Sequence, residues 1–574
     1  MITKNRKKLI VNKKAKPVGE RLAELLVENG IEYVFGVPGG QTLPLYEGIS
    51  KYQGRIQHVL MRDERSAGYA ADAFARVTGR VGVCDGTVGP GATNLLSPLA
   101  EAHCSSIPLI AIVSDVALGW EHRRTRGNAS QAMDQMEMFK PVSKWQVKVT
   151  DPKSIDDIFQ QALRVATTGK PGPVVVCVPV DVASTNIEFN DLVKVADGGL
   201  YPRFRSAPDP EQIKLASTML KSASKPLIVA GGGVHISGCY QQVRDLVEKT
   251  NAALITSLSG KGIVEETHPQ VFGVTGTFGN PVAGAISQEA DVIMFVGCKA
   301  GQITTFNYTS PSSEQAVIHL DMDPEEIGRN YPDSMPLLGD ATLGLNAVLS
   351  ELGDYTLSSQ WDFASYKEKH NQWYRDQTNP ANASKPLRAQ PVMGVIDEFL
   401  TDDDLVVCDA SLASGWAGAY LNFAKAGLRY IAPRGLAGLG WGSPATIGAS
   451  LGNEKASRII QIAGDGGFSY SLQELEVMNR FKLPIVTIVL NNDVFGWIKH
   501  VQKNRYDQNY ISTDFCHVDF ATVAKGFGAR GYTVTMLEEM RDVLARERNP
   551  NGPVVIDVIS DQWETPVQGL SYPD

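Results

Sequence analysis

The chain has 574 residues, of which 43% are apolar and 20% charged, and its formal net charge is −9. This length exceeds what one hydrophobic core supports and predicts about three domains. The negative charge argues against nucleic acid as a partner, because nucleic-acid-binding surfaces are basic, and the absence of a long apolar run predicts no membrane span. Seven scattered cysteines without a CxxC pair indicate reduced thiols and a cytoplasmic protein.

The first sixteen residues carry seven basic side chains and no acidic one. We interpret this segment as a solvated tail, with a targeting role as the alternative. It lacks the apolar stretch of a secretory signal.

Short apolar runs rich in β-branched residues alternate with longer amphipathic segments along the chain. This alternation is typical of parallel sheets covered by helices. Polar stretches at 197–212 and 353–388 interrupt it and are interpreted as linkers. The sequence therefore predicts an α/β protein with three doubly wound parallel-sheet domains, over residues 17–186, 206–352 and 386–562.

The third set of runs carries two polar turns, each after a predicted strand. "RIIQIAGDGG" places Asp465 between glycines, and "PIVTIVLNND" ends on two asparagines that include Asn492. Parallel strands end at the same edge of a sheet, and glycine lets an anion approach the backbone and the helix N-terminus behind it. Asp465, the amide oxygen of Asn492 and the carbonyl of Val494 suit a hard divalent cation that also binds diphosphate and water. Ordinary turn chemistry would explain either turn alone, but the pair at this spacing favours a metal–diphosphate site.

The two turns together resemble the thiamin diphosphate motif, Gly-Asp-Gly followed about one βα unit later by Asn-Asn. The similarity extends to "EYVFGVPGGQTLPLYEGI", "GVCDGTVGPGATNLLSPLAEAHCSSIPLIAI" and "GLAGLGWGSPATIGASLG". The chain is similar to the acetohydroxyacid (acetolactate) synthase and pyruvate decarboxylase superfamily. This resemblance implies a thiamin diphosphate- and Mg²⁺-dependent transferase or lyase, which decarboxylates a pyruvate-like 2-keto acid and then forms a carbon–carbon bond. It also implies a homodimer or homotetramer, whose first domain binds the aminopyrimidine and whose third domain binds the diphosphate across a subunit interface.

By the same resemblance, Glu64 is the carboxylate that hydrogen-bonds the aminopyrimidine, with Asp63 as its nearest rival. Leu439 is the apolar side chain that bends the cofactor, or alternatively a core residue. Gln131 and Lys144 keep the family's spacing, and Gln131 is assigned to the catalytic set. The other predicted cofactor contacts are Pro38, Gly39, Gly40, Ser411, Ser414, Gly464, Gly466, Gly467, Phe495 and Gly496, and the predicted metal ligands are Asp465, Asn492 and Val494.

The match to the family is uneven where the substrate is chosen. The tryptophan with which acetohydroxyacid synthases select a larger acceptor corresponds to Val501, and a tryptophan stands at Trp497 instead. Asp115 replaces a family glutamine, and the arginines at 123–126 form either a solvated loop or a site for an anionic substrate. The alternative activities are therefore a 2-keto acid decarboxylase, a sulfoacetaldehyde acetyltransferase-like enzyme and a 2-hydroxyacyl-CoA lyase. The predicted substrate residues are Asp115, Arg123, Arg126, Lys144, Trp497 and Val501.

The second set of runs contains glycine-rich turns at 229–234 and 273–280. Relatives bind FAD, ADP, CoA or nothing in this domain. The flavin-binding members carry two arginines where this chain has "GCKAGQIT", so FAD or another nucleotide is not favoured here. A flavin oxidase and a thiamin-binding scaffold without catalysis are alternatives from two other functional classes. The scaffold would lack Glu64, Asp465 or Asn492, and all three are present.

Overall fold

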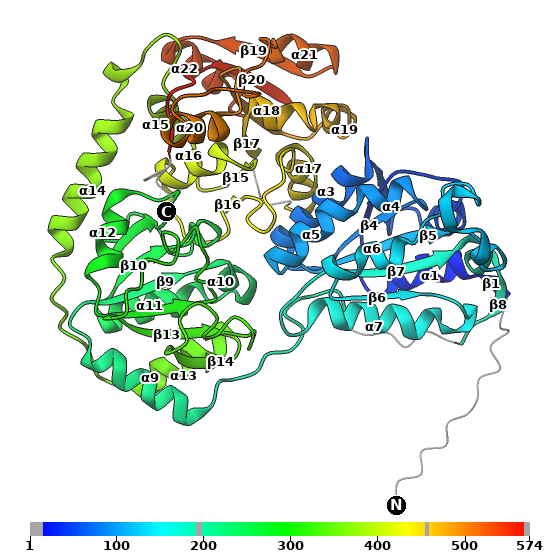
Figure 1. Cartoon of the computed structure of the whole chain (residues 1–574), viewed down its shortest axis with the longest axis horizontal. Helices are drawn as coiled ribbons and strands as arrows, with labels where there is room; N and C mark the ends of the chain where they lie inside the picture. The colour runs from blue at the N-terminus through cyan, green and yellow to red at the C-terminus, as the bar shows by residue number, and fades with distance from the viewer. Residues whose placement is uncertain (1–14, 191–197, 454–457, 567–574) are drawn as a thin grey trace, which may run out of the picture.

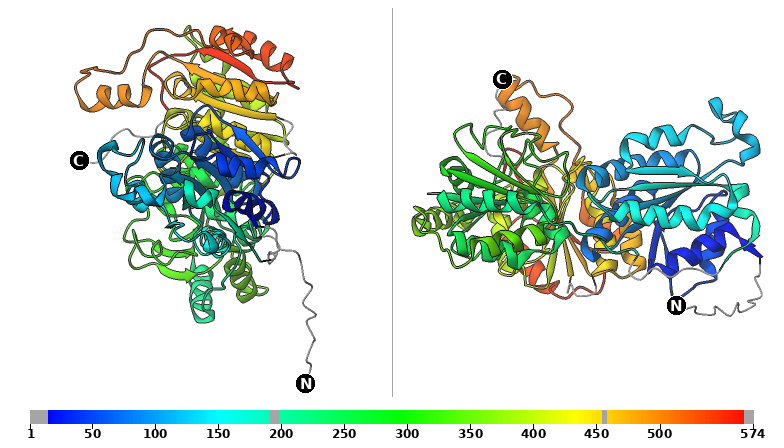
Figure 2. Two further views of the ribbon diagram at one scale, coloured as in Figure 1. Left: turned by 90° about the vertical axis from the view of Figure 1, so that its right-hand side faces the viewer. Right: turned by 90° about the horizontal axis from the view of Figure 1, so that it is seen from below.

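The computed structural model describes residues 15–190, 198–453 and 458–566. Three six-stranded parallel sheets, each flanked by helices, form three domains, which confirms the predicted fold class (Figure 1). The N-terminal domain lies to one side of the other two (Figure 2). Residues 1–14 of the basic N-terminal segment lie outside the described residues.

The N-terminal sheet has the strand order β3-β2-β4-β5-β7-β6. Its strands are β2 (Tyr33–Gly36), β3 (Gln57–Leu60), β4 (Gly82–Gly86), β5 (Leu109–Asp115), β6 (Trp145–Lys148) and β7 (Val174–Pro179). Both β4 and β5 are buried along their whole length, as expected for strands covered by helices on both faces. The helices are α1 (Val18–Glu28), α2 (Leu43–Ser50), α3 (Glu64–Thr78), α4 (Pro90–Asn94), α5 (Leu96–Ser105), α6 (Gln135–Phe139), α7 (Ile155–Thr167) and α8 (Val180–Ser184), with 3₁₀ turns η1 (Leu118–Arg123), η2 (Thr125–Gly127), η3 (Lys140–Val142) and η4 (Pro152–Ser154). A small antiparallel pair joins β1 (Ala15–Pro17) to β8 (Asn186–Glu188).

The central sheet has the strand order β11-β10-β9-β12-β13-β14. Its strands are β9 (Pro226–Ala230), β10 (Ala253–Thr256), β11 (Val271–Val274), β12 (Val292–Val296), β13 (Ala316–Asp321) and β14 (Met335–Leu338). Its helices are α9 (Pro210–Ser222), α10 (Gly232–Ser237), α11 (Tyr240–Thr250), α12 (Pro281–Glu289) and α13 (Ala341–Leu352), with the 3₁₀ turn η5 (Leu258–Gly260). The predicted second linker contains α14 (Phe363–Thr378), which runs along the outside from the central to the C-terminal domain, and the turn η6 (Pro380–Asn382) (Figure 1).

The C-terminal sheet has the strand order β16-β15-β17-β18-β20-β19. Its strands are β15 (Asp404–Cys408), β16 (Tyr430–Ile431), β17 (Arg458–Gly464), β18 (Ile485–Asn491), β19 (Arg530–Val534) and β20 (Val554–Ile559). Its helices are α15 (Ala389–Phe399), α16 (Leu412–Tyr420), α17 (Gly442–Gly452), α18 (Asp465–Ser469), α19 (Leu475–Arg480), α20 (Gly496–Arg505), α21 (Phe520–Gly526) and α22 (Leu537–Arg546), with the 3₁₀ turn η7 (Leu472–Glu474). The helix that the sequence predicts over residues 471–481 consists of η7 and α19, and the glycine turn before it forms the short helix α18; the backbone of Ser471 leaves the helical region between them.

Each of the three sheets has an internal point at which its strand order reverses. The reversal lies between β2 and β4 in the N-terminal sheet, between β9 and β12 in the central sheet, and between β15 and β17 in the C-terminal sheet. The N-terminal and C-terminal sheets follow the same permutation of strands. Open parallel sheets bind ligands in the crevice at such a reversal, outside the carboxyl ends of the strands. The fold therefore indicates three edges at which ligands would bind.

The N-terminal and C-terminal domains share one hydrophobic core, in which α3 packs against α17. A Cβ added to Gly448 of α17 would lie 1.9 Å from the backbone oxygen of Ala70 in α3, so only glycine allows the two helix backbones this approach. The helix that begins at Glu64 is thereby fixed against the C-terminal domain of its own chain.

The remaining features agree with the expectations from composition. All seven cysteines are free, as predicted. Among the helices that the structure describes, none has the length and apolar character needed to cross a membrane.

Candidate active site

The predicted metal–diphosphate residues meet at the edge of the C-terminal sheet. Strands β17 and β18 are parallel neighbours, with Gly464 opposite Leu490, so Asp465 and Asn492 emerge side by side. Oδ2 of Asp465 accepts hydrogen bonds from the backbone N–H groups of Asn492 at 3.1 Å and Asp493 at 2.6 Å, and Oδ1 accepts one from Gly466 at 2.7 Å. These bonds hold the two turns together and fix the direction of the carboxylate.

The environment of Asp465 suits a cation. Only 4% of the residue is exposed, and burial raises the pKa of its carboxyl to about 6, an effect that the three backbone N–H groups partly offset. A nearby cation would restore the charged form. No atom lies within 4 Å of the place where a Cβ on Gly464 would be, so the approach to the backbone is open. Within the described residues, no cluster of three or more His, Cys, Asp or Glu side chains could hold a metal; the predicted ligand set consists instead of one carboxylate, one amide and one carbonyl oxygen. These residues fit Mg²⁺ bound to a diphosphate.

The two asparagines of the second turn have different roles. Asn491 is buried and donates to the backbone oxygen of Val518 and to Asp557, both at 3.0 Å, so it stabilises the sheet. Asn492 is half-buried, and its Oδ1 is the acceptor for the backbone N–H of Val494 at 3.4 Å. The sequence alone could not separate them by environment.

The glycines of these turns leave no room for side chains on their packed sides. A Cβ on Gly466 would lie 2.7 Å from the ring of Phe495, and one on Gly496 would lie 2.8 Å from Leu412. A Cβ on Gly467 would lie 2.5 Å from Oδ2 of Asp409. Phe495 itself stacks edge-on against Phe515, with ring centroids 4.5 Å apart. The turn at 491–496, called the metal turn after its predicted ligands, is therefore closely packed on its inner side, as is the turn at 464–467.

A buried carboxylate, Asp409, organises the loop that carries Leu439. It accepts hydrogen bonds from the backbone N–H of Ala410 at 2.7 Å and from Gly440, at 3.1 Å to each oxygen. Burial raises its pKa to about 6. Leu439 is half-buried between Gly438 and Gly440. Sequence reasoning did not single out Asp409, since its partners lie some thirty residues away and no local spacing marks them.

The other predicted diphosphate loop begins α16. Ser411 adopts φ 67°, a left-handed conformation that is unusual for serine and is found at functional turns. Ser414 is buried, and its Oγ donates to the backbone oxygen of Ser411 at 2.9 Å. This loop follows β15 and the Asp465 turn follows β17, so the two flank the strand reversal of the C-terminal sheet.

The predicted aminopyrimidine residues gather at the corresponding edge of the N-terminal sheet. Pro38, Gly39 and Gly40 follow β2, and a Cβ on Gly39 would lie 2.3 Å from Oγ1 of Thr87, which follows β4. Glu64 is the first residue of α3 and only 8% exposed. Its structural context is thus a buried carboxylate next to two glycine-rich loops.

Three residues of the N-terminal domain position Glu64. Asn94 Nδ2 donates to Oε2 of Glu64 at 2.9 Å, and a Cβ on Gly91 would lie 2.9 Å from Oε1. Asp63, the rival candidate, is the N-cap of α3 and accepts a hydrogen bond from the Ser66 N–H at 2.8 Å. Asp63 therefore stabilises the helix start, whereas Glu64 faces the loop at 86–94.

Gln131 lies beside this loop but is exposed. Its backbone has φ 64°, and a Cβ on Gly89 would lie 2.1 Å from its carbonyl oxygen, so Gly89 is required for the contact. Sequence reasoning missed the buried Gln135, whose Oε1 accepts from the Gly89 N–H at 3.3 Å and whose Nε2 donates to the Ser114 carbonyl at 2.7 Å. Gln135 fixes the loop, and its place inside a short helix gave no signal.

The predicted anion-binding residues are not brought together. Asp115 is fully buried, and both its oxygens bind Arg124 at 2.8 Å. Arg123 and Arg126 are exposed in η1 and η2. Lys144 donates to the backbone oxygens of Val165 and Thr168 at the end of α7, and burial lowers its pKa to about 8. Asp115 and Lys144 thus have partners of their own within the N-terminal domain.

The predicted acceptor residues of α20 lie against the central domain. Trp497 and Val501 are both half-buried in the core of the C-terminal domain. The Trp497 ring contacts the ring of Phe278, with centroids 5.5 Å apart. Phe278 belongs to the glycine-rich loop after β11, so two domains meet beside the metal turn.

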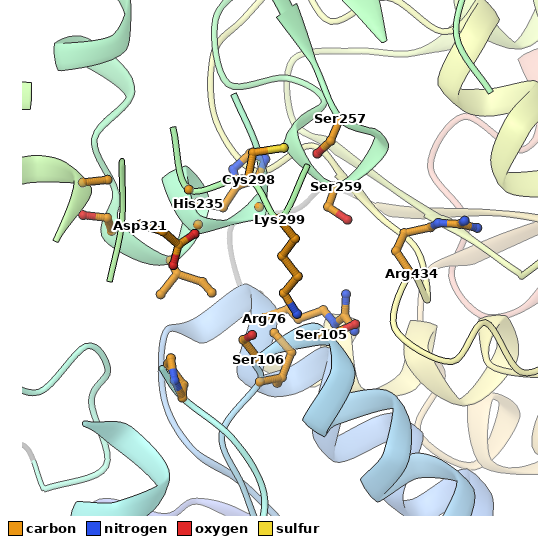
Figure 3. Close-up of a pocket in the computed structure, with 18 of the residues that line it drawn as sticks. Arg76, Ser105, Ser106, His235, Ser257, Ser259, Cys298, Lys299, Asp321 and Arg434 are labelled. Atoms are coloured by element: carbon orange, nitrogen blue, oxygen red, sulfur yellow. The ribbon is translucent and has the colours of Figure 1, made fainter. Parts of the chain in front are cut away.

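A cavity of about 630 Å³ lies where the three domains meet (Figure 3). The glycine turns after β9 and β12 line it, and these turns mark the strand reversal of the central sheet. Lys299 extends into it from the central domain toward Ser105 and Ser106 (Figure 3). Arg434 of the C-terminal domain lines its edge, with the guanidinium turned away from Lys299 (Figure 3). The cavity lies beside the edge of the C-terminal sheet that is predicted to bind the cofactor. Its lining residues do not include Asp465, Asn492 or Glu64.

Comparison with known proteins accounts for all three domains. Residues 16–138 match the model "Thiamine pyrophosphate enzyme, N-terminal TPP binding domain", residues 213–352 match the central domain and residues 409–558 match the C-terminal TPP binding domain. A probable acetolactate synthase large subunit of Methanococcus aeolicus is 31% identical, over 94% of this chain and 92% of its own length. The chain belongs to the thiamine pyrophosphate enzyme family.

Two further members are similar over nearly the whole chain. The probable acetolactate synthase large subunit of Methanocaldococcus jannaschii is 31% identical, over 95% of this chain and 92% of its own length. The acetolactate synthase of Mycobacterium bovis is 30% identical, over 93% and 86% respectively. This thiamine pyrophosphate enzyme therefore has the domain composition of acetolactate synthase-like proteins. Its cofactor is thiamine pyrophosphate, which is also called thiamin diphosphate.

Proposed function

We propose that this enzyme is an acetolactate synthase-like carboligase that depends on thiamin diphosphate and Mg²⁺. It takes a pyruvate-like 2-keto acid as donor, releases carbon dioxide and joins the remaining fragment to a second carbonyl compound. The observation that carries the proposal is the junction of Asp465 and Asn492 beside the open backbone of Gly464. Acetolactate synthases that are about 30% identical over nearly the whole chain support the reaction class.

The residues of the chain have distinct roles in this proposal. Asp465, Asn492 and the carbonyl of Val494 would hold the Mg²⁺, and the Ser411–Ser414 loop would bind the diphosphate. Leu439, in a loop that Asp409 fixes, would contact the cofactor. When bound, thiamin diphosphate supplies a nucleophilic carbon and an electron sink for decarboxylation.

Glu64 would act as the acid–base group of cofactor activation. It would hydrogen-bond the aminopyrimidine of the bound cofactor, and Asn94 keeps its carboxyl in a fixed direction. Burial beside Gly91 keeps water from this carboxyl. The protein thus contributes orientation and a positioned acid–base group.

We further propose a homodimer or homotetramer, with the cofactor between two subunits. Large apolar side chains flank the predicted cofactor segments and are exposed in the single chain. Leu60 precedes Glu64, Leu436 precedes Leu439, and Tyr470 follows the glycine turn; their exposed fractions are 39%, 52% and 46%. Large apolar side chains exposed around the predicted cofactor site favour burial against another chain. Sedimentation with and without cofactor tests this, and a monomer at saturating cofactor would contradict it.

Incubation with pyruvate, thiamin diphosphate and Mg²⁺ tests the function. Carbon dioxide release is followed, and products are identified by mass. Acetolactate supports a carboligase, whereas acetaldehyde alone supports a simple decarboxylase. The control omits Mg²⁺, which should abolish turnover.

A further inference from the structure

Arg434 is a cationic side chain that the roles above leave unexplained. It lies between β16 and Leu439 and lines the cavity at the junction of the three domains. Its Nη1 is 3.5 Å from Oγ of Ser414, a long hydrogen bond, and its guanidinium lies 5.0 Å from the centroid of the Phe278 ring. Among the described residues, no carboxylate forms an ion pair with it. A guanidinium has five N–H donors, so most of them lack an anionic partner.

Glu101 is the carboxylate that interacts electrostatically with Arg434, but its oxygens already accept hydrogen bonds from other groups. Its Oε1 accepts from Ser105 Oγ at 2.7 Å and from Gly435 N–H at 2.9 Å, and its Oε2 accepts from Leu436 N–H at 2.7 Å and Ala437 N–H at 2.9 Å. Arg76 Nη2 also binds Oε1 at 3.3 Å. Glu101 therefore fixes the loop after Arg434 and has little capacity left for Arg434 itself.

Two other cations of the cavity have carboxylate partners, and a third, Lys299, has only a backbone partner among the described residues. Arg76 is paired with Asp72 at 2.8 Å, and Lys170 with Asp323 at 2.6 Å and Glu326 at 2.8 Å. Lys299 donates to the backbone oxygen of Cys104. Burial lowers the pKa of Arg434, and nearby Tyr430 and Glu101 offset this effect only in part. A charge removed from water is costly unless an opposite charge meets it, so this position suits an anionic ligand.

Arg434 also lies where the cavity meets the cofactor edge. Its hydroxyl partner Ser414 belongs to the predicted diphosphate loop, and the Ser414 carbonyl accepts from Tyr430 OH at 3.1 Å. Its aromatic partner Phe278 contacts Trp497, directly after the metal turn. A ligand at Arg434 is therefore close to both the diphosphate loop and the predicted acceptor residues.

We propose that Arg434 binds the carboxylate of the acceptor 2-keto acid and is a specificity-determining residue; this inference rests on the proposed carboligation. The donor is a poorer match, because its carboxylate must leave as carbon dioxide and a close guanidinium would stabilise the charge that has to be lost. The acceptor keeps its carboxylate in the product. Arginine's fork matches a carboxylate with two parallel hydrogen bonds, which distinguishes a keto acid from a neutral aldehyde.

The test is a competition between two acceptors in the cofactor-loaded enzyme. Pyruvate is the donor, and 2-ketobutyrate and propionaldehyde compete as acceptors, which differ by the carboxylate. In Arg434→Gln, the ratio of the carboxylate-containing product to the aldehyde product should fall about 10-fold to 100-fold. Arg434→Lys keeps the charge but not the two parallel donors of arginine, so its product ratio should lie between those of Arg434→Gln and the unsubstituted enzyme. Arg203→Gln is the matched control, since Arg203 is also half-buried over an aromatic ring, Phe204, at 5.5 Å but does not line the cavity. It should keep the ratio of the unsubstituted enzyme.

A binding measurement separates this inference from the proposed function. Oxamate, an unreactive analogue with a carboxylate, and its neutral amide are titrated into the cofactor-loaded enzyme by calorimetry. Oxamate should bind the unsubstituted protein and bind Arg434→Gln at least 10-fold more weakly, with the melting temperature and thiamin diphosphate affinity retained. Equal oxamate affinity or an unchanged product ratio would overturn the role of Arg434. Absence of carbon dioxide release would instead overturn the proposed function, and the oxamate result would still decide the role of Arg434 in anion binding.

Discussion

The carboxyl group of Glu474 accepts a hydrogen bond from the backbone N–H of Arg62, 3.3 Å away and in another domain. The neighbouring Gln473 donates to Oδ2 of Asp63 at 3.2 Å. Arg62 and Asp63 immediately precede Glu64, the predicted activating carboxylate. The 3₁₀ turn after the Gly-Asp-Gly segment therefore holds the start of α3 in place, and the two predicted halves of the cofactor machinery are connected within one chain.

We predict that Glu474→Gln stabilises the protein at neutral and alkaline pH. Burial raises the pKa of Glu474 to about 8, against an ordinary value near 4.5. Between these values the unfolded chain has lost the proton while the folded chain retains it, so the side chain costs stability as the pH rises. The gain from glutamine should grow from near zero below pH 5 to about 2–4 kcal/mol at pH 8.

Melting temperatures measured from pH 5 to 9 check this prediction. Glu47→Gln is the control, because that side chain is largely exposed, and its melting curve should follow the unsubstituted protein at every pH. A Glu474→Gln protein whose relative stability does not change with pH would show that Glu474 is ionised in the folded state.

Asp465→Asn should remove Mg²⁺-dependent binding of thiamin diphosphate. The substitution keeps the shape of the side chain but loses the only carboxylate of the predicted ligand set, so cofactor affinity should fall at least 10-fold. Because burial raises the pKa of Asp465 to about 6, affinity in the unsubstituted protein should fall as the pH drops through 6 and the carboxyl becomes neutral. Calorimetric titration at fixed Mg²⁺ measures both effects. Asn substitution of the exposed Asp507 should leave affinity unchanged; similar affinity in Asp465→Asn would remove this residue from the metal site.

Glu64→Gln should separate cofactor binding from turnover. Glutamine can still hydrogen-bond Asn94, so the loop and the cofactor site should form, but it cannot hold or release the proton. We expect thiamin diphosphate affinity within about 3-fold of normal and carbon dioxide release reduced by 100-fold or more. Rapid turnover in this variant would show that another carboxylate is the activating acid–base group, and Asp63→Asn would then be the next variant to assay.

Gly448→Ala should destabilise the protein strongly. The added methyl group would lie 1.9 Å from the backbone oxygen of Ala70, where neither helix can yield without moving the shared core. We expect a loss of about 1–3 kcal/mol or more, measured by chemical unfolding. Gly526→Ala is the matched control, because no atom lies within 4 Å of its added Cβ. If both variants are equally stable, the two helices are not in backbone contact in solution.

The sequence predicted the fold and the metal edge because their signals are local. Strand runs, glycine turns and the spacing of Asp465 and Asn492 are all visible within about thirty residues. Asp409, Gln135 and Arg434 could not be identified in this way, because no motif in the sequence marks their contacts with Gly440, Gly89 and Phe278. The arginine loop shows the same limit: the sequence offers three arginines, and only the fold reveals that Arg124 is the one that pairs with Asp115.

The close contact of α3 and α17 has a consequence for an assembly of two subunits. Glu64 is anchored to the diphosphate-binding domain of its own chain, through Gly448 against Ala70 and Glu474 against Arg62. In the proposed dimer the same Glu64 serves a cofactor held by the other subunit. Any displacement at one subunit's metal turn is then transmitted to the carboxylate offered to its neighbour, so the two reaction centres would not work independently.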